Sequence, residues 1–199
     1  MYEKLIWETL KPLLVTEVPT EMDDDNPVEY DDEPDEDYEY TSRLESFEEY
    51  IARVGDLVPD VPHNVLEYWI YRHYDFILNE YIELGIENME FVREWWDVEK
   101  VYNEIKLFDG EELGGMGYHI YEEEDDMDDW LADYMLEHRT WPEPIIVLDN
   151  ISLTSWGTPF HLMEGHRRLD YLREVYQEER DTLKSLHEVW VLTLKSDRI

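Results

Sequence analysis

The chain has 199 residues, of which 52 are acidic and 16 are Lys or Arg, so its formal net charge is −36 at pH 7. This charge argues against general binding to DNA, RNA or anionic lipid, which it repels within a Debye length of roughly 8 Å at physiological salt. Cysteine is absent, which excludes disulfides, thiol nucleophiles and cysteine-ligated metal centres. With 43% hydrophobic residues, the chain can still build a core, and its length allows one domain or one domain plus an appended segment.

The first 15 residues do not combine a basic region with a long apolar stretch, and no run of 18 apolar residues occurs anywhere in the chain. We therefore expect a cytoplasmic protein without a membrane segment.

Residues 21–39 form a dense acidic block without Lys or Arg, interrupted by Pro27 and Pro34. The block has too few apolar groups to offset the entropy lost on ordering, so we expect residues 1–41 to be an acidic, partly flexible segment. It is either a solvated acidic loop or a surface whose acids imitate the phosphates of nucleic acid or meet a basic protein partner. Under the second interpretation the candidate partner-binding residues are Asp23, Asp24, Asp25, Asp31, Asp32, Asp35, Glu36 and Asp37.

Residues 42–88 are predicted to be helical. Ser42 and Glu45 have the spacing of a capping box, which predicts a short helix running to Gly55. A longer amphipathic helix is predicted after Pro62 and is expected to end at Gly85. Its expected inward positions are Val65, Leu66, Trp69, Ile70, His73, Phe76, Ile77 and Leu84.

From residue 89 onward the pattern alternates between strands and helices. Predicted strands cover Met89–Trp96, Pro144–Asp149, Phe160–Met163 and Val189–Leu194. Three helices are predicted in this part of the chain. The first follows Asp97, with inward positions Val98, Val101, Ile105 and Leu107. The second covers residues 125–138, and the third begins at His166. Trp95 and Trp96 are expected to be core or interface anchors. This order predicts an α+β (α/β) domain.

A second acidic run precedes the helix expected at 125–138. It adds Glu122, Glu123, Glu124, Asp125, Asp126, Asp128 and Asp129 to the candidate partner-binding residues. The run lacks the alternation and central glycine of an EF-hand loop, so we predict no metal site. Residues 1–159 carry a net charge of −35 and residues 160–199 only −1, so the negative charge is concentrated in the front of the chain.

The near-neutral C-terminal part contains the strongest candidate for a binding site in the sequence, the segment EGHRRLDYLR, which begins at Glu164. A strand is expected to end there, Gly165 allows a tight turn, and His166, Arg167 and Arg168 fall in the first turn of a helix. Helix N–H groups, the positive end of the helix dipole and two guanidiniums suit a phosphate or carboxylate. The alternative interpretation is that both arginines form structural ion pairs.

The segments PEPIIVLDN (142–150) and EGHRRLDYLR (164–173), followed by the strand VWVLTL, resemble the ParB/sulfiredoxin-like superfamily. The resemblance implies a ParB/sulfiredoxin-like domain at 89–199, with a small mixed sheet and packed helices behind the N-terminal acidic and helical regions. It also implies that the loop formed by Gly165, His166, Arg167 and Arg168 binds a nucleotide, ATP or CTP, together with Mg²⁺.

The departures from the family restrict this inference. Sulfiredoxins have a nucleophilic Cys where this chain has His166, so their reaction is excluded. The sequence ends at Ile199 soon after the last predicted strand, so we expect no counterpart of the helical domain that reads DNA in partitioning proteins.

Two functions from different classes follow. The first is an acidic binding protein on a ParB-like scaffold that captures or inhibits a basic partner, as an immunity protein, an antitoxin or a DNA mimic would. The partner would be a toxin or a nucleic-acid-binding protein. The second is a nucleotide-dependent phosphotransferase or nucleotidase that uses the Gly165–Arg168 loop, with a catalytic base that the sequence does not single out among so many carboxylates.

Overall fold

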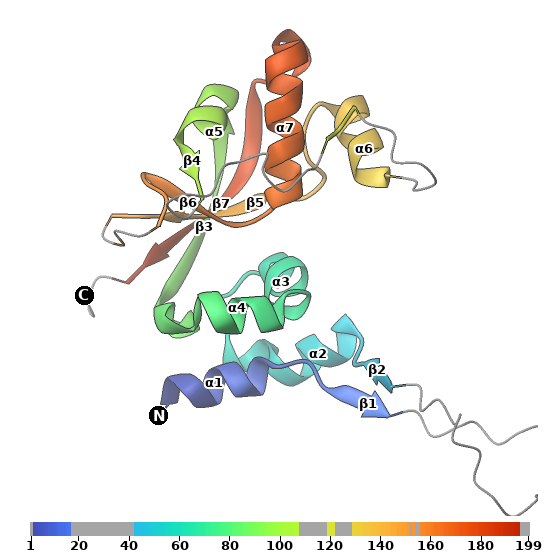
Figure 1. The fold of residues 1–199 in the computed structure, drawn as a ribbon. Helices are drawn as coiled ribbons and strands as arrows, with labels where there is room; N and C mark the ends of the chain where they lie inside the picture. Colours follow the sequence, from blue (N-terminus) through green and yellow to red (C-terminus); the bar gives the residue numbers. More distant parts are fainter. Residues whose placement is uncertain are drawn as a thin grey trace, which may run out of the picture. The chain divides into compact units, whose positions relative to one another are not determined.

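A computed structural model describes residues 2–16, 42–107, 119–121, 129–151, 153 and 156–195. The chain is a mixed helix and sheet protein, and it divides into two compact units, Met1–Glu87 and Asn88–Ile199 (Figure 1). The predicted α+β class is confirmed at this level. The acidic residues of 21–39 and 122–128 lie outside the described residues. No helix in the described ranges combines the length and the apolar composition needed to cross a membrane.

The first unit is helical apart from one small two-stranded ladder. Its elements are α1 (Tyr2–Leu10), β1 (Leu14–Thr16), β2 (Ser42–Leu44), α2 (Phe47–Val54), η1 (Gly55–Leu57), α3 (His63–Val65), the π-helix η2 (Leu66–Tyr71), α4 (Tyr74–Glu80), η3 (Ile82–Leu84) and η4 (Ile86–Asn88), which ends just past the division. Trp7 and Leu10 of α1 are fully buried, so residues 2–16 pack as part of this unit.

The capping box lies four residues later than predicted. Ser46 caps α2 by accepting from Glu49 N–H, and the Glu49 carboxylate accepts from Ser46 N–H. The prediction at Ser42 was wrong because residues 42–44 pair with β1 as an antiparallel strand, which places Ser42 opposite Thr16. The predicted helix end at Gly55 is confirmed.

The predicted helix over 65–84 is present only in pieces. Val65, Leu66, Trp69, Ile70, Ile77 and Leu84 are buried as expected, but His73 and Phe76 are exposed, and Tyr74 and Tyr81 are buried in addition. The physical reason is the π-helix η2, whose wider turn shifts the inward face by about one residue and ends in a turn at 72–73. A strict 3.6-residue period cannot anticipate this shift.

A buried ion pair fastens the N-terminal segment to α2. Arg53 contacts the Glu45 carboxylate and also donates to the carbonyl oxygens of Thr9 and Lys11, the latter at 2.8 Å. Glu45 is only 4% exposed, and its carboxylate accepts from Leu13 N–H at 2.9 Å. The hydrogen bonds from Arg53 lower the pKa of Glu45.

The second unit is built on a five-stranded mixed sheet. Its elements are β3 (Met89–Asp97), α5 (Val98–Glu104), β4 (Ile105–Lys106), α6 (Trp130–His138), β5 (Ile145–Asp149), β6 (Phe160–Glu164), α7 (His166–Glu179), η5 (Arg180–Thr182) and β7 (Leu186–Leu194). The strand order is β3-β7-β5-β6-β4. The β3–β7 and β5–β6 pairs are antiparallel, whereas β7–β5 and β6–β4 are parallel.

All four predicted strands of this unit are confirmed, with β7 starting three residues earlier than expected. Asp97 caps α5 by accepting from Lys100 N–H, also as predicted. The helix expected to include Ile105 and Leu107 was wrong beyond Glu104, because Ile105 instead pairs with Phe160 in the parallel β4–β6 ladder. The helix expected over 125–138 begins at Trp130 within the described residues.

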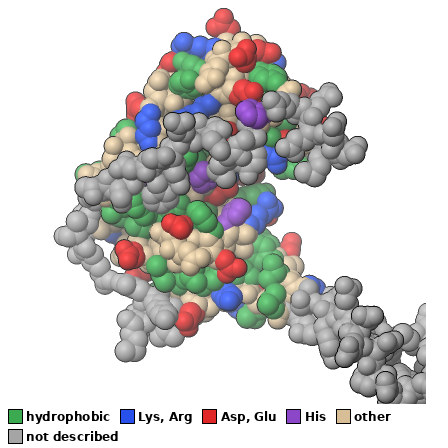
Figure 2. Space-filling model, viewed as in Figure 1, with side chains coloured by type: hydrophobic (Ala, Val, Ile, Leu, Met, Phe, Trp, Pro, Cys, Tyr) green, Lys and Arg blue, Asp and Glu red, His purple; other side chains and the backbone are tan. Residues whose placement is uncertain are grey.

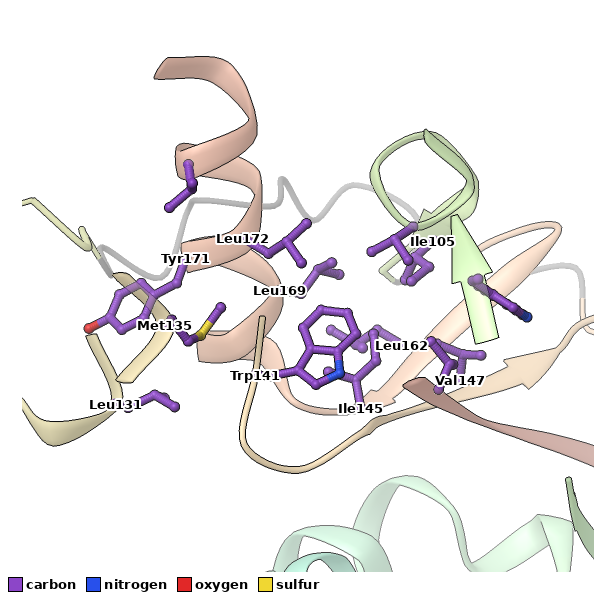
Figure 3. Packing of buried hydrophobic residues seen from close by; sticks show 14 of the residues in the cluster. Ile105, Leu131, Met135, Trp141, Ile145, Val147, Leu162, Leu169, Tyr171 and Leu172 are labelled. Atoms are coloured by element: carbon purple, nitrogen blue, oxygen red, sulfur yellow. The ribbon is translucent and has the colours of Figure 1, made fainter. Parts of the chain in front are cut away.

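Helices α5, α6 and α7 lie on one side of the sheet (Figure 1), and one hydrophobic core fills the space between these helices and the sheet. Figure 3 shows Leu169 and Leu172 of α7 directed toward Trp141 and the sheet residues. Sheet residues of this core include Ile145, Val147, Leu162, Val189 and Val191, all at most 5% exposed. The indole of Trp141 donates to Glu188 O at 2.8 Å, so its one polar atom is satisfied inside the core.

We predict that Arg53→Ala destabilises the first unit by about 2–4 kcal/mol, because it leaves the buried Glu45 carboxylate without its cation. Urea unfolding followed by tryptophan fluorescence would measure the loss. The matched control is Arg72→Ala, since Arg72 is exposed and stacks on Tyr68 at 4.6 Å, and should cost less than about 1 kcal/mol. Equal losses for the two variants would contradict the role given to the Arg53–Glu45 pair.

A second prediction concerns His187 of β7, which is fully buried and hydrogen-bonded through Nδ1 to Thr140 Oγ1 at 2.9 Å. Burial lowers the pKa of His187 to about 4, so below pH 6.5 the unfolded chain takes up a proton that the folded chain refuses. Between pH 7 and 5 the wild type should lose roughly 2 kcal/mol more than His187→Asn, which cannot ionise. Parallel stability curves for the two proteins over this range would contradict the assignment.

Candidate functional site

The strand, turn and helix predicted around Gly165 are confirmed. β6 ends at Glu164, Gly165 has φ +102° and ψ 29°, and α7 begins at His166. A Cβ at Gly165 would lie 2.5 Å from Ile145 Cγ2 on β5, so both the positive φ and the close approach of β5 require glycine. The glycine thereby sets the position of the two arginines that follow.

Arg168 is 9% exposed and braces the turn from inside. Its guanidinium contacts the Glu164 carboxylate at the end of β6 and donates to Glu143 O at 2.9 Å and Pro144 O at 3.4 Å. The side chain therefore joins the start of α7 to the segment that leads into β5. This geometry is that of a structural cross-link, in which the donors are directed to atoms of the chain itself.

Arg167 lies closer to solvent, with 42% of its side chain exposed, and contacts the carboxylate of Asp129. Its Nε donates to Tyr171 Oη at 2.9 Å, and Tyr171 Oη in turn donates to Asp129. Asp129 also caps α6 by accepting from Leu131 and Ala132 N–H at 3.1 Å. Burial opposes ionisation of Asp129, but these hydrogen bonds and the charge of Arg167 outweigh it and hold its pKa below the ordinary value.

The four residues predicted to bind an anion follow one another across the turn, but the two guanidiniums contact different carboxylates of the same chain, Asp129 and Glu164. The histidines near the turn do not form a ligand set: within the described ranges no group of three His, Asp or Glu side chains could hold a metal ion. His161 is fully buried, and its Nδ1 accepts from Gly157 N–H at 3.2 Å. Burial lowers the pKa of His161 to about 4, so it is neutral near pH 7.

Of the acidic residues predicted to bind a partner, Asp129 is described, and the other fourteen lie outside the described residues. The structure does fix where both acidic segments begin and end. Residues 17–41, which hold 13 acids and no Lys or Arg, leave from Thr16 and return at Ser42, which are directly opposite in the β1–β2 ladder. They therefore start and finish at one place on the first unit.

The ends of the second acidic segment, 122–128, are both held by α7. Ile120 N–H donates to Glu174 Oε2 at 2.7 Å, and Asp129 is held by Arg167 and Tyr171. Glu174 and Arg167 are seven residues apart, which is about two turns of helix. The described residues on either side of this segment are therefore both anchored on α7.

Arginine throughout the described residues is committed to contacts within the chain. Seven of the nine described arginines form ion pairs, namely Arg43–Glu49, Arg53–Glu45, Arg93–Glu188, Arg139–Glu179, Arg167–Asp129, Arg168–Glu164 and Arg180–Glu99. On the face seen in Figure 2, Lys and Arg side chains lie among Asp and Glu side chains. The described residues still hold 29 acids against 15 bases, so acid remains in excess after this pairing.

The two adjacent tryptophans of β3 have different environments. Both were predicted to be core or interface anchors, but they lie on opposite faces of β3, with Trp96 3% exposed and Trp95 61% exposed. Strand alternation at 89–97 was the available signal, since it requires that adjacent residues face opposite ways.

No protein-family model matches the sequence, and neither a curated protein nor a solved structure shows significant similarity to it.

We predict that Gly165→Ala destabilises the second unit by about 2–4 kcal/mol, because alanine is strained at φ +102° and its Cβ would overlap Ile145. The measurement is urea unfolding, with circular dichroism to confirm that the variant folds. Gly55→Ala is the control, since Gly55 has an α-helical φ of −55° and a Cβ there meets nothing closer than 3.5 Å. That variant should be neutral or stabilised by up to about 1 kcal/mol, and equal losses at both glycines would contradict the role of Gly165.

Proposed function

We propose that this chain is an acidic binding protein that captures or inhibits a basic partner. The observation that supports this proposal most directly is the distribution of charge. The described residues use their arginines to neutralise their own carboxylates, while residues 17–41 and 122–128 together contribute 19 acids and no Lys or Arg. A partner rich in Lys and Arg would supply the counter-charge, and the long-range field would speed encounter.

The exposed surface next to the first acidic segment favours a protein partner. Leu14 and Leu44 are directly opposite in the β1–β2 ladder and are 71% and 52% exposed. An apolar pair beside dense acid suits a partner that offers both basic and apolar side chains, such as a toxin or the nucleic-acid-binding face of a protein. An immunity protein, an antitoxin or a DNA mimic has these requirements, and each would act in the cytoplasm.

For the scaffold we propose the finer ParB/sulfiredoxin-like assignment. The element order α6, β5, β6, α7, β7 with a glycine turn before α7 supports it, as does the mixed sheet. The fold places no requirement on function, since one scaffold serves many sites.

The second candidate function, a nucleotide-dependent phosphotransferase or nucleotidase, has support from the turn geometry alone. A phosphate at this turn would have to displace Asp129 from Arg167, because that guanidinium already contacts a carboxylate. Arg168 would have to abandon contacts to Glu164 and two carbonyl oxygens. The cost of both displacements is why the binding protein is preferred.

We predict that affinity for a 15-residue oligolysine peptide falls at least about tenfold between 50 and 200 mM NaCl, because exposed charges are screened. Fluorescence anisotropy of the labelled peptide measures the effect. Neutralising Glu122, Glu123, Glu124, Asp125, Asp126 and Asp128 as amides should weaken binding several-fold at low salt. Affinity that does not depend on salt would remove the basis of the proposal.

The matched control neutralises six exposed acids of the first unit instead: Glu48, Asp56, Asp60, Asp75, Glu80 and Glu83. This variant has the same net charge, so a smaller loss in binding than for the 122–128 variant would support a localised contact. Equal losses would show that total charge alone attracts the peptide.

Calorimetry with ATP and with CTP, each with and without Mg²⁺, distinguishes the two candidate functions. The binding protein predicts no heat of binding to the wild type. Binding that Arg167→Ala abolishes would favour the nucleotide enzyme; Arg167 suits this test because it is partly exposed, whereas Arg168 braces the fold.

A further inference from the structure

The edge strand β3 offers a second, fully described surface that suits the same kind of partner. β3 has nine residues and ends the sheet order β3-β7-β5-β6-β4, so β7 is its neighbour on one side. Within the described part of the chain no strand pairs with its other side. Long edge strands present backbone N–H and C=O groups that another chain can pair with.

The register shows which backbone groups face the open side. Val98 N–H donates to Ser185 O and Lys195 N–H donates to Asn88 O, at the two ends of the β3–β7 ladder. Hydrogen-bonded pairs alternate with non-hydrogen-bonded pairs in an antiparallel ladder. The even-numbered residues of β3 therefore bond to β7, and the N–H and C=O groups of Arg93 and Trp95 point to the open side.

The side chains along this edge are exposed and alternate between acid and apolar. Glu90, Val92 and Glu94 share one face of β3, and all three are exposed, Val92 to 52%. On the opposite face, Trp95 is 61% exposed, next to Arg93, which pairs with Glu188. An added strand would thus meet acid, apolar and acid on one face and an open indole on the other.

Charge decides which strand can be added. A second copy of this chain is disfavoured, because two chains of charge −36 repel each other. Pairing two copies about Val92 would also place Glu90 opposite Glu94, and pairing them about Arg93 would place two arginines opposite each other. A segment with Lys or Arg opposite Glu90 and Glu94 and an apolar residue opposite Val92 would complement the edge.

We propose that β3 binds an extended basic segment of the partner as an added strand. Its Lys or Arg side chains would lie opposite Glu90 and Glu94, where the non-hydrogen-bonded geometry brings facing side chains closest. A further basic side chain would cover Trp95 by a cation–π contact. This inference rests on the proposed function. It names the surface by which the chain would prefer one basic sequence over another, a preference that dispersed acidic residues alone would not provide.

The test uses the full chain and the peptide acetyl-Arg-Lys-Thr-Val-Thr-Lys-amide, which carries the complementary pattern for antiparallel pairing. Its matched control is the same peptide with N-methyl groups on the Arg and on the first Thr, the residues that would bond to Trp95 and Arg93. The two peptides have the same side chains and charge. At 150 mM NaCl we expect the unmodified peptide to bind at least tenfold more tightly, and to slow hydrogen exchange of the Arg93 and Trp95 amides.

Two protein variants distinguish strand addition at the β3 edge from non-specific electrostatic attraction of the peptide. Arg93→Pro leaves the ladder to β7 intact, because the Arg93 N–H faces the open side, but it blocks an added strand. Arg93→Ser removes the same charge and keeps the N–H. We expect the tenfold preference to disappear in Arg93→Pro and to persist in Arg93→Ser.

Equal affinity of the wild-type chain for both peptides would overturn the inference, whatever Arg93→Pro does to folding. If that shared affinity is salt-sensitive, the chain captures cations without the edge, and the proposed function stands alone. Failure of both peptides and of oligolysine to bind at 50 mM NaCl would overturn the inference and the proposed function together.

Discussion

Positive charge is scarce in this chain, and its few guanidiniums govern how the described segments are held together. The chain has 52 acids against 16 bases, and several of its described arginines join segments that are distant in sequence. Arg53 joins α2 to residues 9–13, and Arg168 joins α7 to the segment before β5. In both cases one guanidinium satisfies backbone carbonyl oxygens and a carboxylate at once, which its planar array of donors allows and a lysine ammonium would not match.

The same use of arginine continues along α7 and in η5 directly after it. Arg167 holds Asp129, and Arg180 holds Glu99 at the start of α5. Arg173 donates to the carbonyl oxygens of Tyr102 and Ile105, and burial lowers the pKa of Arg173 to about 10. Helix α7 is thereby fastened to α5, to β4 and to the start of α6. These cross-links direct most of the described arginines to carboxylates and carbonyl oxygens of the chain itself.

Three acidic features follow from this arrangement, each carried by a part of the chain that the arginines hold in place. The described residues that flank the two acidic segments are held at the β1–β2 ladder and along α7. The third is the edge of β3, where Glu90 and Glu94 flank Val92. Acid on an edge strand also disfavours pairing with another copy of the same strand.

Features that depend on neighbours along the chain could be predicted from the sequence. The acidic excess, the α+β class, the four strands of the second unit, the Asp97 cap and the turn at Gly165 followed from local pattern and from the backbone preferences of Gly and Asp. Tertiary structure decided the rest. Ser42 lies in a strand because it pairs with β1. The inward face after Ile70 shifts because of the π-helix η2. Ile105 lies in a strand and not in the predicted helix because it pairs in parallel with β6. Tertiary structure also decided that Arg167 and Arg168 contact Asp129 and Glu164, and that Trp95 is exposed while Trp96 is buried, because ion-pair partners and burial are set by segments far away in the sequence.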